Sequence, residues 1–201
     1  MKPISITDRI VLLGTVLLAA YQVAVGVNGL DSFAILCYTI AFGVLLVACL
    51  LLIILGFEIL DSPLVVIVST IIPLSLSLGL VWEYLVNIRH SYLVFAVLGF
   101  VAVIITRQFT PGRPAVIVLA VVHGIAGMLI FLLPIVLSMQ GITNRGFIFV
   151  GIGGALIGVG GLLLSFLKTG RPILSRDAIL TILPGLLLLM TITFVTGFVL
   201  R

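Results

Sequence analysis

The first residue to consider for chemistry is His123, an ionisable side chain inside a long apolar segment. It lies in the stretch AVIVLAVVHGIAGMLIFLLPIVL, nine residues after Pro114. A helix that begins at Pro114 carries it roughly 14 Å from the membrane surface, near the midplane. A neutral imidazole at this depth can relay protons or ligate haem iron, so His123 is a candidate intramembrane site. The alternative, which we favour, is a structural histidine that is hydrogen-bonded across a helix contact.

Glu83 is the second candidate, in the stretch PLSLSLGLVWEYLVNIRH. It lies 20 residues after Pro63, so a helix from that proline has risen roughly 30 Å and reaches the far edge of the hydrocarbon. Trp82 and Tyr84 are typical of the headgroup belt, which favours a satisfied interfacial carboxylate. The alternative is a proton or cation site in a vestibule, because four polar or small residues recur at four-residue spacing and share one helix face. These residues are Ser75, Gly79, Glu83 and Asn87.

The ionisable residues argue against several chemistries. His90 follows the third apolar segment, so it lies at the membrane surface, about 15 Å in depth from His123, and the two histidines do not pair on one haem. No HExxH motif, GxSxG motif or phosphate-binding loop is present, and no lysine lies between Asp177 and Arg201 to form a retinal Schiff base. We therefore expect a protein that is not an enzyme, with no cofactor and no metal site, and with bound lipid.

Composition identifies the elements that hold these residues. Of the 201 residues, 63% are hydrophobic and 8% are charged, and the mean hydropathy is +1.51. These values are typical of a polytopic membrane protein. Apolar runs of about 20 residues favour helices over the shorter alternating strands of a barrel. We therefore predict an all-α fold, a polytopic transmembrane helical bundle. Because the loops are short, residues 1–201 form a single integral membrane domain.

Charged residues, Gly, Pro and Asn divide the chain into seven predicted spans. The spans lie near residues 10–29, 33–56, 63–86, 91–107, 114–138, 147–167 and 178–200. The fourth span is at the short end of what crosses about 30 Å of hydrocarbon. Asp61 precedes the third span and is a natural N-cap for it.

The basic residues predict the orientation of the spans, because short cytoplasmic loops collect Lys and Arg. With the N-terminus in the cytoplasm, seven basic residues lie inside and three lie outside. A fourth span that did not cross would reduce the best division to six against four. We predict a cytoplasmic N-terminus, a C-terminus outside, and the plasma (inner) membrane of a prokaryote. The net charge of +4 then reflects topology, and we expect no nucleic-acid partner.

Five of the inner basic residues concentrate on two loops. Each contributes on the order of 1 kcal/mol toward an anionic lipid surface, so we expect lipid headgroup phosphates or an acidic cytoplasmic partner at these loops. The alternative is that these residues act only as topology determinants. The five residues are Arg107, Arg113, Lys168, Arg171 and Arg176.

Small residues form one face of the sixth span, in VGIGGALIGVGGLLL. They fall at intervals of three and four and include the GxxxG of Gly154 and Gly158, which favours close helix packing. The alternative is a gating helix that slides because its side chains do not lock it. The residues of this face are Gly151, Gly154, Ala155, Gly158 and Gly161.

Two functions from different classes fit this pattern. The scarcity of polar groups within the spans favours a non-catalytic accessory or scaffold subunit of a larger membrane protein complex, with other integral membrane subunits as partners. The alternative is a small-solute or ion transporter or channel, since Pro73, Pro134 and Pro184 interrupt three spans. The polar residues available to line its path are Gln22, the stripe of Ser75, Glu83 and Asn87, His123, Thr191 and Thr193. We favour the accessory subunit.

Overall fold

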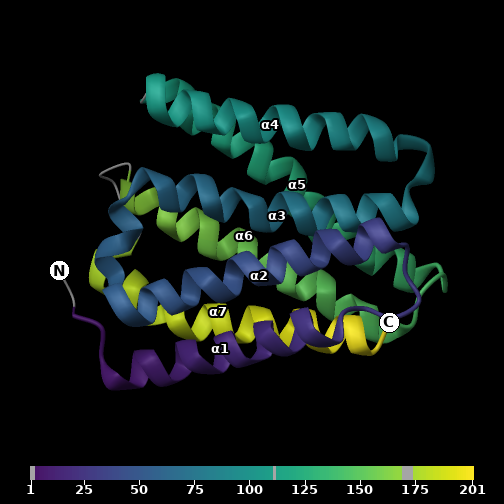
Figure 1. The fold of residues 1–201 in the computed structure, drawn as a ribbon, viewed down its shortest axis with the longest axis horizontal. Helices are drawn as coiled ribbons and strands as arrows, with labels where there is room; N and C mark the ends of the chain where they lie inside the picture. Colours follow the sequence, from purple (N-terminus) through teal and green to yellow (C-terminus); the bar gives the residue numbers. More distant parts are fainter. Residues whose placement is uncertain (1–2, 111, 169–173) are drawn as a thin grey trace.

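The computed structural model describes residues 3–110, 112–168 and 174–201, with the backbone alone for residue 162 and residues 164–168. Over this part of the chain the fold is all-helical, as the apolar runs predict, and seven α-helices lie along the long axis of the molecule (Figure 1). The helices are α1 (Ile6–Val25), α2 (Ser32–Leu55), α3 (Pro63–Tyr84), α4 (Arg89–Phe109), α5 (Arg113–Met139), α6 (Ile148–Lys168) and α7 (Arg176–Val199).

Six of the described helices are long and apolar enough to cross a membrane. The segment Val86–Phe109, which holds α4, is one of them with 24 residues, because a 3-10 turn at Val86–Ile88 leads directly into the helix. The fourth span predicted at 91–107 was therefore too short. The remaining apolar segment, Arg145–Gly161, which holds the first part of α6, is shorter than the six candidate spans over its described residues.

The start of the first helix differs from the prediction. α1 begins at Ile6 and not near residue 10, because Ser5 and Asp8 form a capping box. The Ser5 hydroxyl oxygen accepts a hydrogen bond from the Asp8 N–H at 3.1 Å, and the Asp8 carboxylate accepts one from the Ser5 N–H at 3.0 Å. α1 ends at Gly26, whose φ of 69° suits a residue without a Cβ atom, and so stops short of residue 29.

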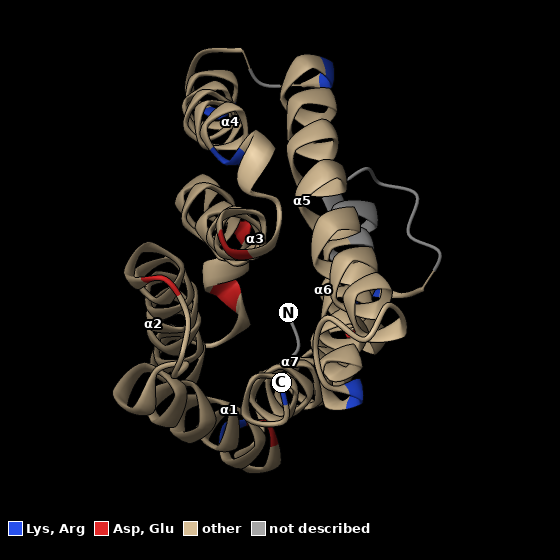
Figure 2. Ribbon diagram, turned by 90° about the vertical axis from the view of Figure 1, so that its right-hand side faces the viewer, with Lys and Arg blue, Asp and Glu red and all other residues tan. Residues whose placement is uncertain are grey.

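Six of the helices form a closed ring. In order around the ring they are α1, α2, α3, α5, α6 and α7, and each packs against the next, with α7 returning to α1. Figure 2, which looks along the helices, shows this ring and shows α4 outside it, against α3 and α5. The ring therefore joins the first and last helices of the chain, which lie side by side in Figure 1.

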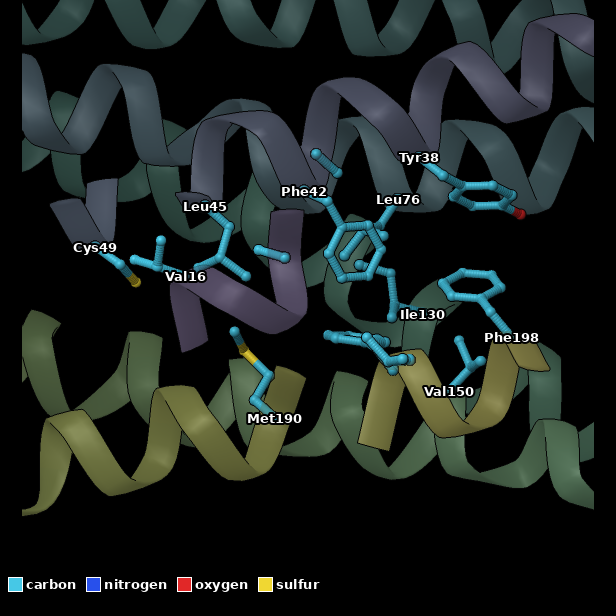
Figure 3. Packing of buried hydrophobic residues seen from close by; sticks show 14 of the residues in the cluster. Val16, Tyr38, Phe42, Leu45, Cys49, Leu76, Ile130, Val150, Met190 and Phe198 are labelled. Atoms are coloured by element: carbon cyan, nitrogen blue, oxygen red, sulfur yellow. The ribbon is translucent and has the colours of Figure 1, made fainter. Parts of the chain in front are cut away.

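Large apolar side chains fill the centre of the ring. Phe42 on α2 and Phe194 and Phe198 on α7 are buried. The ring of Tyr38 packs on that of Phe198 with 4.6 Å between centroids, and Phe42 meets Phe194 edge-on at 6.3 Å. Figure 3 shows Tyr38, Phe42 and Phe198 converging on the space that Ile130 enters from α5. The ring therefore encloses a packed apolar core.

The helices alternate in direction. Helices α1, α3, α5 and α7 begin at the end of the bundle that carries the N-terminus, and α2, α4 and α6 begin at the end that carries the C-terminus (Figure 1). We call these the N-terminal end and the C-terminal end of the bundle. The two chain termini thus lie at opposite ends of the bundle.

Candidate functional site

Glu83 lies at the C-terminal end of the bundle, in the last turn of α3. Its Oε2 atom accepts a hydrogen bond from the backbone N–H of Asp31 at 2.9 Å. Asp31 is the N-cap of α2, and its own Oδ1 atom accepts from the Phe33 N–H at 2.8 Å. The Glu83 carboxylate therefore fastens the link between α1 and α2 to the end of α3.

Arg201 makes two further hydrogen bonds at the same end of the bundle. One guanidinium nitrogen donates to the Tyr84 hydroxyl at 3.1 Å, and the other donates to the Asn28 carbonyl oxygen at 3.0 Å. These bonds connect the end of α7 with the end of α3 and with the α1–α2 link. We call Glu83, Asp31, Tyr84, Asn28 and Arg201 together the C-terminal polar cluster. Sequence reasoning assigned Arg201 only to topology, and no local pattern indicates partners that lie 117 and 173 residues away.

The predicted polar stripe on α3 does not form a vestibule. A Cβ atom on Gly79 would lie 2.6 Å from the Tyr38 ring, so this face of α3 packs tightly against α2. Ser75 is half-buried on the same helix. Asn87 is exposed and does not continue the stripe, because α3 ends at Tyr84 and Asn87 belongs to the following 3-10 turn. The structure therefore does not gather the four residues at one site.

His123 is half-buried on α5. Its Nδ1 atom lies 3.2 Å from the Leu119 carbonyl oxygen, one turn earlier in the same helix. A carbonyl only accepts, so Nδ1 carries the proton in this hydrogen bond. We had expected His123 to hydrogen-bond to a neighbouring helix. That prediction was wrong, because the imidazole bonds to a carbonyl of its own helix. Among the described residues, no three His, Cys, Asp or Glu side chains gather as a metal site requires.

The predicted cationic residues differ in their surroundings. Arg113 is exposed at the start of α5, and Arg107 is half-buried near the end of α4, with its Nε atom buried and without a hydrogen-bond partner. The side chain of Lys168 and all of Arg171 lie outside the described residues.

Arg176 is paired with a carboxylate. One of its guanidinium nitrogens lies 3.0 and 2.9 Å from the two carboxylate oxygens of Asp61. The N-cap position of α3 is Ser62, directly before Pro63, so the N-cap role predicted for Asp61 was wrong. Asp61 instead ties the 3-10 turn after α2 to the start of α7 at the N-terminal end.

Hydroxyl groups in the interior are satisfied largely by their own helices. The hydroxyls of Thr70, Thr191 and Thr193 each donate to a carbonyl oxygen three or four residues earlier. The Tyr92 hydroxyl of α4 donates to the Ser77 hydroxyl of α3 at 2.8 Å. The threonine hydroxyls are therefore bonded within their own helices, and the Tyr92 hydroxyl joins α4 to α3.

Two buried polar atoms in the ring have no hydrogen-bond partner in the described part of the chain. They are the Gln22 Oε1 atom and the Tyr38 hydroxyl oxygen. A cavity of about 10 Å³ inside the ring is lined by the apolar side chains of α2, α3 and α7, Phe42, Met190 and Phe194 among them. This volume is at the lower limit for one water molecule.

The small-residue face of α6 divides into two parts. A Cβ atom on Gly151 would lie 2.7 Å from the Phe131 carbonyl oxygen, and one on Gly154 would lie 2.8 Å from the Ile130 carbonyl carbon, so the backbones of α5 and α6 are in contact. Among the described atoms, added Cβ atoms on Gly158 and Gly161 meet nothing within 4 Å. Ala155, between these two parts, is half-buried. Close packing therefore involves Gly151 and Gly154.

A further close approach lies on the other side of α6 and was missed from the sequence. A Cβ atom on Gly197 of α7 would lie 2.5 Å from the Val150 backbone nitrogen. A Cβ atom on Gly153 would lie 2.8 Å from the Phe194 ring. Gly153 belongs to the same glycine-rich run, but the sequence does not indicate that α7 is the helix that packs against it. α6 is thus held closely between α5 and α7.

The chain matches no protein-family model, no curated protein and no solved structure. Function is therefore argued from the geometry of the chain itself. The polar side chains at the C-terminal end join helices and links, the Asp61–Arg176 pair does the same at the N-terminal end, and the ring between them is filled by apolar side chains.

Proposed function

We propose that the protein is a non-catalytic integral membrane accessory or scaffold subunit of a larger membrane protein complex. The observation that carries this proposal is the packed centre of the six-helix ring. A path for a polar solute needs polar groups along its length, whereas this centre holds Phe42, Phe194 and Phe198 and a cavity of about 10 Å³. A rigid apolar bundle with its polar groups used at its two ends is suited to structural support.

We further propose seven spans, with the N-terminus in the cytoplasm and the C-terminus outside, in the plasma (inner) membrane of a prokaryote. The division of basic residues, seven against three, supports this orientation. The positions of the termini at opposite ends of the bundle agree with an odd number of crossings. In this orientation the C-terminal polar cluster lies outside, and the Asp61–Arg176 pair lies at the cytoplasmic surface.

The partners that we propose are other integral membrane subunits and anionic lipid headgroups. α4 lies outside the ring and turns apolar side chains away from it, with Leu98 63% exposed and Val97 53% exposed. This outward face of α4 is our candidate for the subunit contact, because lipid-facing helices associate through close packing of such surfaces. Of the five predicted basic residues, exposed Arg113 and half-buried Arg107 are our candidates for contact with headgroup phosphates.

A transporter or channel is the second candidate. Pro73, Pro134 and Pro184 lie buried inside three helices of the ring, and the Gln22 Oε1 and Tyr38 hydroxyl oxygen atoms lack partners. Proline within a helix marks a place where it bends, so a second conformation with a hydrated ring would give these two atoms water partners. Transport would require this rearrangement, and for that reason we rank it second.

Native mass spectrometry of the tagged protein, extracted from its own membrane in a mild detergent, tests the proposal. We expect a defined assembly that contains other integral membrane subunits. A Leu98→Trp variant should lose those subunits, whereas Ile10→Trp, on the 64% exposed Ile10 of α1, should keep them. A monomer or homo-oligomer that carries only lipid would overturn the proposal. Liposome flux assays with His123→Ala and Glu83→Gln would then test transport.

A further inference from the structure

A groove opens between α4 and α5 toward the C-terminal end of the bundle. The two helices are in close contact where Gly99 meets Val122, with 3.1 Å between an added Cβ atom and the valine methyl carbon. Beyond this contact α5 crosses away from α4 (Figure 1). The space that results has a volume of about 640 Å³. Ile88, at the N-cap position of α4, and Tyr92 of α4 lie opposite α5 residues from Gly124 to Val136.

The wall of the groove suits hydrocarbon. Met128 and Leu132 lie along the α5 side, and the Tyr92 ring contributes to the α4 side. The Tyr92 hydroxyl is already bonded to Ser77, so this ring presents no unsatisfied polar atom to an occupant. Gly124 leaves the inner end of the groove open, because a Cβ atom there would meet nothing within 4 Å.

The length of the groove fits one leaflet of a bilayer. Gly124 and Val136 are 12 residues apart on α5, which corresponds to roughly 18 Å along the helix. One leaflet contributes about 15 Å of the hydrocarbon thickness. A transmembrane helix of a partner would need a contact surface about twice as long, so the dimensions favour a single acyl chain.

A cation follows one of the lining residues of the groove in the sequence. Arg89 directly follows Ile88, and its guanidinium carbon lies 5.1 Å from the centroid of the Trp82 ring. The Arg89 Nε–H donates to the His90 Nε2 atom at 3.4 Å. No carboxylate pairs with Arg89 in the part of the chain that is described, so its charge is available to an external anion.

We propose that the groove binds one acyl chain of a phospholipid from the leaflet at the C-terminal end of the bundle, and that Arg89 binds the phosphate of the same lipid. The groove supplies the apolar contact and the guanidinium supplies the charge complementarity, so the two parts select an anionic phosphate attached to a hydrocarbon chain. This site is independent of the proposed accessory role, and Leu98 is not among the residues that line the groove.

The experiment counts phospholipid retained by the full-length protein. The protein is delipidated in a mild detergent, dioleoyl phosphatidylglycerol is added in steps, and native mass spectrometry measures the occupancy of the first bound lipid. Gly124→Leu fills the groove, and Gly158→Leu is its matched control, because both glycines are exposed and an added Cβ atom meets nothing within 4 Å at either. Arg145→Gln, at the same end of the bundle, is the control for Arg89→Gln.

We expect Gly124→Leu to lose the first bound lipid and Gly158→Leu to keep it. Arg89→Gln should weaken retention about fivefold, the effect of one basic residue near a lipid surface, and Arg145→Gln should leave it unchanged. Equal retention by the two leucine variants would overturn the acyl-chain site. Equal retention by the two glutamine variants would overturn the phosphate contact. A co-purified membrane protein that Gly124→Leu alone releases would also overturn the proposal, since a partner helix would then occupy the groove.

Discussion

The two glycines of the GxxxG motif on α6 should respond in opposite directions to the same substitution. In Gly154→Ala the new Cβ atom would lie 2.8 Å from the Ile130 carbonyl carbon and 2.8 Å from the Phe131 nitrogen. Carbon contacts are comfortable from about 3.5 Å, so the backbones of α5 and α6 must separate by about 0.7 Å. Both clashing atoms belong to the backbone and cannot turn aside.

The neighbouring helix prevents that separation. α6 also contacts α7, where a Cβ atom on Gly197 would lie 2.5 Å from the Val150 nitrogen. Overpacking of a close-packed interior lowers the free energy of unfolding by about 1–3 kcal/mol. The better helix propensity of alanine raises it by up to about 1 kcal/mol. We therefore expect Gly154→Ala to lower the free energy of unfolding by about 1–2 kcal/mol. Gly158→Ala meets open space and should raise it by up to about 1 kcal/mol.

Titration with sodium dodecyl sulfate in dodecyl maltoside micelles measures this difference, with circular dichroism following the loss of helix. Both variants differ from the native chain by one methyl group at positions one turn apart, so micelle effects cancel. Equal unfolding free energies for the two variants would refute the close contact of α5 with α6 at Gly154. A more stable Gly154→Ala variant would refute it as well.

Three further predictions concern single contacts. Asp61→Asn removes the ion pair with Arg176 and should lower the unfolding free energy by about 0.2–1 kcal/mol at low salt. The effect should be smaller at high salt, because the side chains of Asp61 and Arg176 are 51% and 43% exposed and salt screens the pair. A double-mutant cycle with Arg176→Gln measures the coupling energy of the pair. Glu83→Ala, which removes the acceptor, should speed hydrogen exchange at the Asp31 amide, and unchanged exchange would argue against the hydrogen bond from Asp31 to Glu83. Tyr92→Phe should cost about 1 kcal/mol in unfolding free energy, and no loss would show that its bond to α3 contributes nothing.

Helix positions follow from the sequence where length and composition decide them. The apolar runs predicted seven helical segments, and each corresponds to an observed helix. The rise from Pro63 correctly predicted that Glu83 lies at the end of α3. The start of α1 was misplaced because the capping box of Ser5 and Asp8 carries the helix past its charged residues, which had been taken as a boundary.

The neighbours of each helix could not be predicted in the same way. In a soluble bundle the polar face of a helix marks its outside, but in α2 exposed Leu36 and buried Leu45 have the same chemistry. The sequence therefore does not indicate which side of a helix faces the ring. Gly154 and Gly158 show this, because they belong to one GxxxG motif and yet Gly154 packs against α5 while an added Cβ atom on Gly158 meets no described atom within 4 Å. The partners of Glu83 and Arg176 lie 52 and 115 residues away and follow only from the closure of the ring.

The contact between α1 and α7 constrains how the chain is made. Synthesis begins at the N-terminus, so α1 enters the bilayer long before α7 exists. Until then the side of α1 that α7 will cover lies against lipid tails. A chain that stops before residue 176 leaves this side of α1 without its contact to α7. Formation of α7 is therefore the step that closes the ring, and a chain in which the ring is still open exposes surface that favours misassembly.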